Sequence, residues 1–82
     1  KSLAKFFGDF RVDYEKFAFV DLGSGKGRVL LMASEYPFKK ITGVEFSSEL
    51  HEIAVKNIKN YKNPARKCFN IESIHEDAAR FI

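Results

Sequence analysis

Cysteine and long apolar runs are scarce in this chain, and each of these two shortages excludes a class of protein. The 82 residues include one cysteine, Cys68, and no tryptophan. One cysteine excludes an intramolecular disulfide framework and a zinc site built from several thiolates, and His51 and His75 lack ligand spacing. The longest apolar run, 29–33, is too short to span a bilayer, and no signal-like segment opens the chain. We therefore expect a cytoplasmic protein with no metal site and no membrane partner.

Glycine and proline are also few, at five and two residues, which excludes collagen-like and low-complexity chains. Hydrophobic residues make up 45% of the chain and charged residues 30%, as in folded globular proteins. The net charge of +3 is too small to argue for nucleic acid by itself. One segment, 56–67, carries five cations and no acid. Such a segment could contact a nucleic-acid backbone, although a solvated helix end that complements the helix dipole is its more common role.

Short apolar runs alternate with helical patterns along the chain. The expected strands are 17–22, 40–46 and 69–75. The expected helices are 28–36 and 48–62, with Ser47 or Ser48 as the cap of the second, a leading helix or turn over 1–16, and a new turn or helix from 76. The run 17–22 is almost continuously apolar, which is typical of a strand buried on both faces.

This order predicts an α/β fold with a parallel sheet, because parallel strands need helical crossovers between them. The simplest strand order is 3-2-1, which is one half of a Rossmann-like, doubly wound sheet. The first strand would be central in a complete sheet and is left here as an edge. The chain begins at Lys1 and stops on the apolar pair Phe81-Ile82. We therefore expect 1–82 to be the N-terminal half of a domain, with 17–82 as its ligand-binding part.

The candidate binding loop contains Gly23, Gly25 and Gly27, between the first strand and the first helix. Glycine allows the sharp turn, the positive φ angles and the close backbone approach that such a loop needs, and N–H groups at the helix start face a polar ligand. The spacing is G-x-G-x-G, with Arg28 in the place of the third glycine of the dinucleotide pattern G-x-G-x-x-G. This departure speaks against NAD.

The second strand ends in Gly43-Val44-Glu45-Phe46. Glu45 lies 22 residues after Gly23, near the distance at which an acidic residue accepts hydrogen bonds from ribose hydroxyls. Phe46 follows it and could pack on an adenine face, or serve as an ordinary core or rim aromatic. A solvated strand end or a salt bridge is the alternative role of Glu45.

The segment Asp21-Leu22-Gly23-Ser24-Gly25-Lys26-Gly27 resembles motif I of the class I S-adenosylmethionine-dependent methyltransferases, and the run 19–28 is most similar to uncharacterised bacterial members. The similarity covers roughly 17–80. It implies S-adenosyl-L-methionine as cofactor, bound by the loop residues Asp21, Gly23, Ser24, Gly25 and Gly27 together with Glu45 and Phe46. In that family, an acidic residue at the position of Asp77 accepts a hydrogen bond from the adenine amine. The backbone N–H of the next residue, here Ala78, donates to a ring nitrogen. A helix cap is the alternative role of Asp77.

The resemblance implies a methyltransferase whose catalytic residues follow Ile82, so we assign no catalytic base here and expect the fragment alone to be inactive. The methyl acceptor stays open among protein, nucleic acid and small molecules. Three other functions also stay open: the NAD-binding half of an oxidoreductase, aminopropyl transfer on the same scaffold, and a non-catalytic interaction fragment. The last would be able to self-associate through the open sheet edge.

Overall fold

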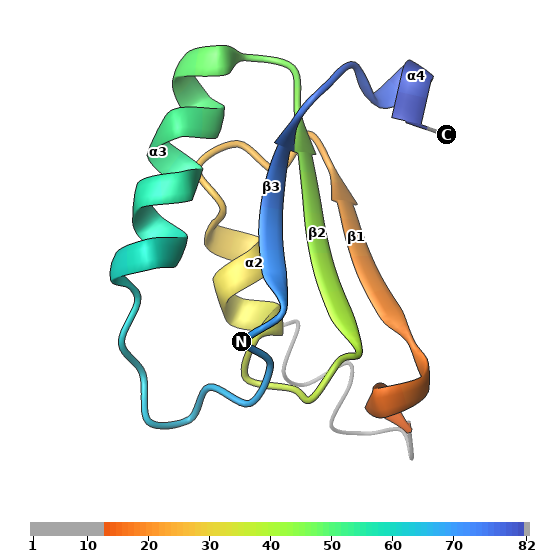
Figure 1. The fold of residues 1–82 in the computed structure, drawn as a ribbon, viewed down its shortest axis with the longest axis vertical. Helices are drawn as coiled ribbons and strands as arrows, with labels where there is room; N and C mark the ends of the chain where they lie inside the picture. The colour runs from red at the N-terminus through yellow and green to blue at the C-terminus, as the bar shows by residue number, and fades with distance from the viewer. Residues whose placement is uncertain (1–12, 82) are drawn as a thin grey trace.

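The computed structural model describes residues 13–81, in which strands and helices alternate as predicted (Figure 1). The elements are the 3-10 turn η1 (Tyr14–Lys16), strands β1 (Ala18–Leu22), β2 (Lys40–Glu45) and β3 (Ile71–His75), and helices α2 (Arg28–Ala33), α3 (Ser48–Asn60) and α4 (Ala78–Phe81). The leading helix expected over 1–16 lies mostly outside the described residues. Its last residues form η1.

Helix α2 is three residues shorter than predicted. It ends at Ala33, and the hydroxyl of the next residue, Ser34, donates to the carbonyl of Leu31. Pro37 follows closely, and a residue before proline is disfavoured in helical conformation. The helix therefore ends before Tyr36, which sequence patterns alone placed inside it.

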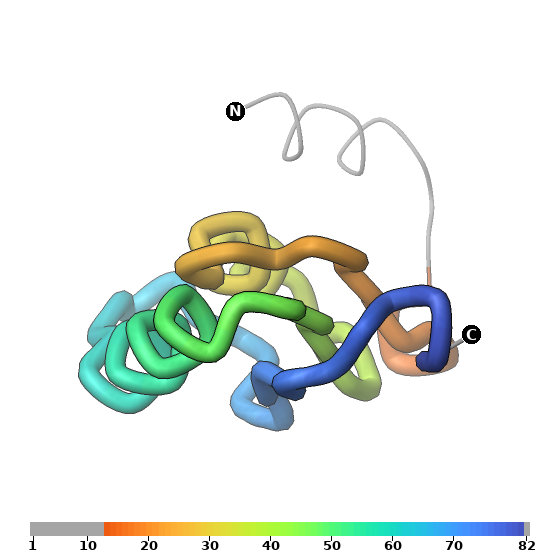
Figure 2. Tube along the Cα trace, turned by 90° about the horizontal axis from the view of Figure 1, so that it is seen from above, coloured from red at the N-terminus to blue at the C-terminus, as the bar shows by residue number. Residues whose placement is uncertain are grey.

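The three strands form one parallel sheet in which β2 lies between β1 and β3. The register places Asp21 beside Gly43, and Glu45 beside His75. Helices α2 and α3 lie on the same side of the sheet (Figures 1 and 2). The small parallel α/β arrangement predicted from the alternation of elements is therefore confirmed.

The core lies between α2 and this side of the sheet. Its buried residues are Leu30, Ala33, Phe38, Ile41 and Cys68. Aromatic rings extend the core, since the ring centroid of Phe38 is 5.4 Å from that of Phe19 and 5.2 Å from that of Tyr14. Pairs at this separation stabilise a fold beyond the area that they bury.

The prediction that 17–22 is buried on both faces is wrong for the described structure. Val20 and Leu22 are 48% and 44% exposed, whereas Phe19, which points the other way, packs against the core. The physical reason is that α2 and α3 both cover one side, and β1 pairs with a single neighbour, β2. A strand at such an edge exposes the side chains of its uncovered face.

Helix α3 begins where Ser47 caps it, because the Ser47 hydroxyl accepts a hydrogen bond from the N–H of Leu50 at 3.2 Å. The helix has 13 residues, and among residues 13–81 no helix is long and apolar enough to cross a membrane. Ala54, on its buried side, faces Gly27 across a gap that leaves little room: a Cβ added to Gly27 would lie 3.3 Å from the Ala54 Cβ. Two small residues thus let α3 approach the glycine loop.

Gly43, in the middle of β2, allows the other close approach. A Cβ at this position would lie 2.5 Å from both the Leu30 Cδ1 and the Ser24 Oγ, and 2.7 Å from the Ser24 Cβ. These distances are shorter than any normal contact between such atoms. Glycine at 43 therefore lets α2 and the loop before it rest directly on the central strand.

We expect Gly43→Ala to lower the free energy of unfolding by about 1–3 kcal/mol, because the added methyl group overpacks this contact. Urea denaturation measures the change. In a Ser24→Gly background the same substitution should cost less, since the two close Ser24 atoms are then absent. An unchanged urea midpoint for Gly43→Ala would contradict the packing described here.

Candidate functional site

The candidate site lies at the edge of the sheet where all three parallel strands end (Figure 1). The loops that leave this edge are 23–27 after β1, 46–47 after β2 and 76–77 after β3. Ligands of open parallel sheets bind outside the carboxyl ends of the strands. The sequence-predicted site residues belong to these loops, to the strand ends beside them or, in the case of Ala78, to the first position of α4.

The loop of residues 23–27 has the backbone that its glycines predicted. Gly23, Gly25 and Gly27 have φ angles of 80°, 57° and 86°, a region that other residues rarely adopt. The N–H groups of Gly23 and Ser24 donate to the carbonyl of Val44 at 2.7 and 3.1 Å. The loop therefore turns back over the end of β2 before α2 begins.

The carboxylate of Glu45 joins two of the three loops. Its Oε1 accepts from the N–H of Gly25 at 2.7 Å, and its Oε2 accepts from the N–H of Ser47 at 2.9 Å. The backbone carbonyl of Glu45 accepts from the N–H of Glu76 at 3.1 Å, which joins the third loop. Glu45 is only 8% exposed. Within residues 13–81 Glu45 is therefore neither a solvated strand end nor a member of a salt bridge, the two alternatives considered above.

These contacts shift the titration of two acids. Hydrogen bonds from Ser47 and Gly25 hold the pKa of Glu45 below its ordinary value of 4.5, against the opposing effect of burial. Partial burial, and then the negative charge of Glu45, raise the pKa of Asp21 above 3.8. In this site, the ionised form of Glu45 is therefore stabilised, whereas the ionised form of Asp21 is disfavoured.

Asp77 and Phe46 lie at the two loops beyond Glu45. The Asp77 Oδ1 accepts from the N–H of Ala79 at 3.0 Å, so Asp77 caps α4, as the alternative interpretation expected. Phe46 is 73% exposed, which excludes a core role for its ring in the described structure. Its carbonyl accepts a hydrogen bond from the Nε2 of His75 at 2.9 Å.

Ser24 is placed differently from the other loop residues. Its hydroxyl oxygen is buried against Gly43 and has no hydrogen-bond partner within residues 13–81. Its N–H donates to Val44 and its carbonyl accepts from the N–H of Gly27 at 3.0 Å. These two backbone hydrogen bonds of Ser24 thus stabilise the turn of the glycine loop.

Sequence reasoning missed a second set of contacts beside the site. The rings of His51 and His75 stack with centroids 5.7 Å apart, and the Nδ1 of His51 lies 2.8 Å from the hydroxyl of Ser73. The amide of Asn57 donates to the carbonyl of Lys26 at 2.9 Å, which fastens α3 to the glycine loop. The sequence signal for these contacts is weak: His51 and Asn57 each lie three residues from Ala54, which is the spacing of one helix face.

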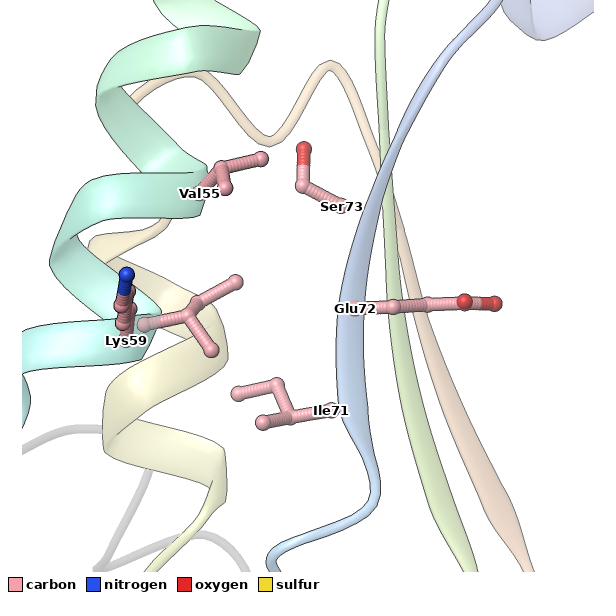
Figure 3. Close-up of a pocket in the computed structure, with 6 residues that line it drawn as sticks. Val55, Lys59, Ile71, Glu72 and Ser73 are labelled. Carbon is pink, nitrogen blue, oxygen red and sulfur yellow. The ribbon is translucent and has the colours of Figure 1, made fainter.

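A cavity of about 290 Å³ lies between α3 and β3, away from the glycine loop (Figure 3). Its lining residues are Val55, Ile58, Lys59, Ile71, Glu72 and Ser73. None of the sequence-predicted site residues lines it. The cavity is therefore separate from the candidate site.

We expect the stability that Glu45 contributes to depend on pH. With a folded-state pKa below the ordinary value, this contribution is complete above about pH 4.5 and is lost as the pH falls through the folded-state pKa. Glu45→Gln should therefore lower the unfolding free energy at pH 7, by about 1–3 kcal/mol if one loop N–H loses its acceptor. The difference from the unsubstituted chain should shrink at pH 3.

Urea denaturation at the two pH values measures this difference. Glu52→Gln is the matched control, because it removes an exposed carboxylate of α3 that makes no hydrogen bond within residues 13–81. A Glu45→Gln cost that is as large at pH 3 as at pH 7 would exclude the ionised carboxylate as the group that holds the loops.

A comparison with solved structures found a similar fold. The fold is similar to the crystal structure of the methyltransferase domain of bacterial-CtHen1-C, with a TM-score of 0.57 and 28% sequence identity. The match covers 74% of this chain and 31% of that one, so the chain spans about a third of the solved domain. A comparison with curated proteins found no significant match.

The comparison with protein families matches more of this chain than the solved structure does. A family model described as "Histone methylation protein DOT1" matches residues 2–79. Together with the structural match, it confirms the resemblance to S-adenosylmethionine-dependent methyltransferases that the glycine loop first indicated. Because the match spans nearly the whole chain, the chain belongs to the methyltransferase family of the histone methylation protein DOT1.

Proposed function

We propose that this chain is the S-adenosyl-L-methionine-binding half of a methyltransferase domain. The single observation that carries the proposal is the contact of Glu45 with Gly25, which holds a loop of methyltransferase type against the acid that would receive the ribose. Family membership and the similar solved domain support it. In this interpretation 13–81 forms one half of a doubly wound, Rossmann-like sheet, and the free buried thiol of Cys68 fits the reducing cytoplasm.

The residues at the sheet edge fit an adenosine-containing cofactor. A Cβ added to Gly23 or Gly25 would meet no atom within 4 Å, so the space beside the loop is open to a ligand. Each carboxylate oxygen of Glu45 already accepts one N–H. An ionised carboxylate oxygen can accept two hydrogen bonds, so both oxygens retain capacity for ribose hydroxyls.

Each loop would then hold a different part of the cofactor. Glu45 would accept from the ribose, and the exposed ring of Phe46 would cover the adenine. The Oδ2 of Asp77, which accepts no hydrogen bond within residues 13–81, would accept from the adenine amine, and the N–H of Ala78 would donate to a ring nitrogen. Asp21 and the 23–27 backbone would contact the methionine end or organise the loop beside it.

The bound cofactor would supply an electrophilic methyl group on its sulfonium. The contribution of this chain is orientation: three loops fastened to one residue hold the ligand in a fixed position relative to the sheet. We assign none of residues 13–81 a role in binding the methyl acceptor. The word histone in the family's description refers to the protein for which the family is named, and we do not extend it to this chain.

Amide proton–nitrogen spectra of the chain, titrated with S-adenosylhomocysteine, test the proposal. We expect shifts confined to Gly23–Gly27, Glu45–Phe46 and Asp77–Ala78. NAD is the matched competitor, because a dinucleotide-binding half would respond to it instead. Shifts with NAD and none with S-adenosylhomocysteine would overturn the proposal in favour of an oxidoreductase.

We expect Asp77→Ser to weaken S-adenosylhomocysteine binding about tenfold or more, because it removes a charged acceptor for the adenine amine. Serine still caps a helix, so α4 should persist. Calorimetric titration measures the affinity. Glu15→Ser, which removes one exposed acid of η1, is the control and should bind as the unsubstituted chain does. Equal affinities for all three proteins would exclude Asp77 from the site.

A further inference from the structure

The second half of α3 and the connection to β3 carry a set of side chains that the proposed function does not use. We name it the basic face; it consists of Lys56, Lys59, Lys62, Arg66, Lys67 and Phe69. Its residues come from the second half of α3 and from the connection to β3. Between residues 53 and 71 the sequence contains no acidic residue. In Figure 1 this connection lies at the opposite end of the sheet from the glycine loop.

Within residues 13–81, none of the five cations forms an ion pair. The nearest acid in the sequence is Glu52, four residues before Lys56, and it forms no ion pair within residues 13–81. Two other acids contact residues outside the basic face. Glu72 points away from α3, as Figure 3 shows, and pairs with Lys40 at 3.1 Å. Glu35 accepts from the amide of Asn63 at 3.4 Å. The basic face therefore carries five positive charges that no ion pair within residues 13–81 compensates.

Phe69 distinguishes this surface from an ordinary solvated helix end. Its side chain is 72% exposed, although large apolar residues are usually covered. The guanidinium carbon of Arg66 lies 4.6 Å from the centroid of the Phe69 ring. Arg66 is itself held by a hydrogen bond from its Nε to the carbonyl of Cys68 at 3.0 Å. The guanidinium of Arg66 and the exposed ring of Phe69 thus form a cation–π contact.

The connection that displays these groups is fastened to the core. The carbonyl of Ser34, at the end of α2, accepts from the N–H groups of Lys67 and Cys68 at 2.7 and 3.0 Å. A turn precedes it, in which the N–H of Arg66 donates to the carbonyl of Asn63 at 3.0 Å. Cys68 is buried in the core cluster. A ligand would therefore meet side chains on an ordered backbone, which lowers the entropic cost of binding.

We infer that the basic face binds single-stranded nucleic acid. Lysine and arginine side chains contact phosphates, and an exposed aromatic ring with an adjacent guanidinium offers a stacking surface for an unpaired base. A duplex hides its base faces, and an acidic peptide has none, so the ring favours a single strand over both. The inference does not depend on the proposed cofactor site, which lies at the other end of the sheet.

Fluorescence anisotropy with the full chain tests the inference. The probes are a labelled 20-nucleotide strand of mixed sequence, as DNA and as RNA, the DNA duplex of the same sequence, and a 20-residue oligoglutamate. We expect both single strands to bind with a Kd of about 1–100 μM. The logarithm of the association constant should fall with the logarithm of salt concentration, with a slope no steeper than about −3.5 for five cations. Comparison of the two strands shows whether RNA or DNA is preferred.

Two substitutions separate stacking from charge. Phe69→Leu keeps an apolar side chain and should weaken single-strand binding about fivefold or more without changing the salt slope. Lys62→Gln should weaken binding and make the slope shallower by about 0.7. Arg80→Gln removes one exposed cation from α4, at the other end of the sheet, and should bind as the unsubstituted chain does.

Three results would overturn the inference: no single-strand binding at 100 μM protein in 50 mM salt, equal or tighter binding of the duplex or oligoglutamate, or an unchanged affinity for Phe69→Leu. All three substituted residues are exposed, so the fold should persist, and circular dichroism checks this. Binding of S-adenosylhomocysteine should be the same in all variants, so failure here leaves the proposed function untouched.

Discussion

The carboxylate of Glu45 is the constraint on which the candidate site depends. The loop after β1 must be flexible enough to bend at three positive φ angles, and such a backbone does not hold its shape alone. Hydrogen bonds from Gly25 and Ser47 to the two oxygens of Glu45 fix it to the end of the central strand. The backbone of Glu45 then fixes the loop after β3 through Glu76. One residue thus sets the relative positions of three loops.

The surrounding sequence is arranged so that this residue can act. Gly43, two residues earlier, lets Ser24 and Leu30 lie on the strand, which brings the loop within reach of Glu45. Gly27 and Ala54 let α3 approach from the other side, and Asn57 fastens the helix to the loop through Lys26. The ionised form of Glu45 is favoured by the same N–H groups that it orders. Loop shape and local charge therefore have a common origin.

Much of the fold could be predicted from the sequence, as could several residues that the structure brings together at the candidate site. The glycine spacing, the acid at 45 and the alternation of apolar runs each have a local physical cause, so a single chain displays them. The sequence could not show which way the Glu45 oxygens point. A glutamate that faces a ligand and a glutamate that accepts hydrogen bonds from backbone N–H groups look the same in a sequence. The exposure of Val20 and Leu22, and the contact of His51 with Ser73, depend on what lies across space, which no local pattern records.

The structure places the Glu45 carboxylate and the glycine-loop backbone at one end of a small sheet, and the connection that carries Arg66 and Phe69 at the other. A crystal structure of the chain with S-adenosylhomocysteine tests the central claim most directly. The account predicts ribose hydroxyls within hydrogen-bond distance of Glu45, with its contacts to Gly25 and Ser47 preserved. A ligand in the cavity between α3 and β3, or a loop that has left Glu45 to admit the ligand, would contradict it.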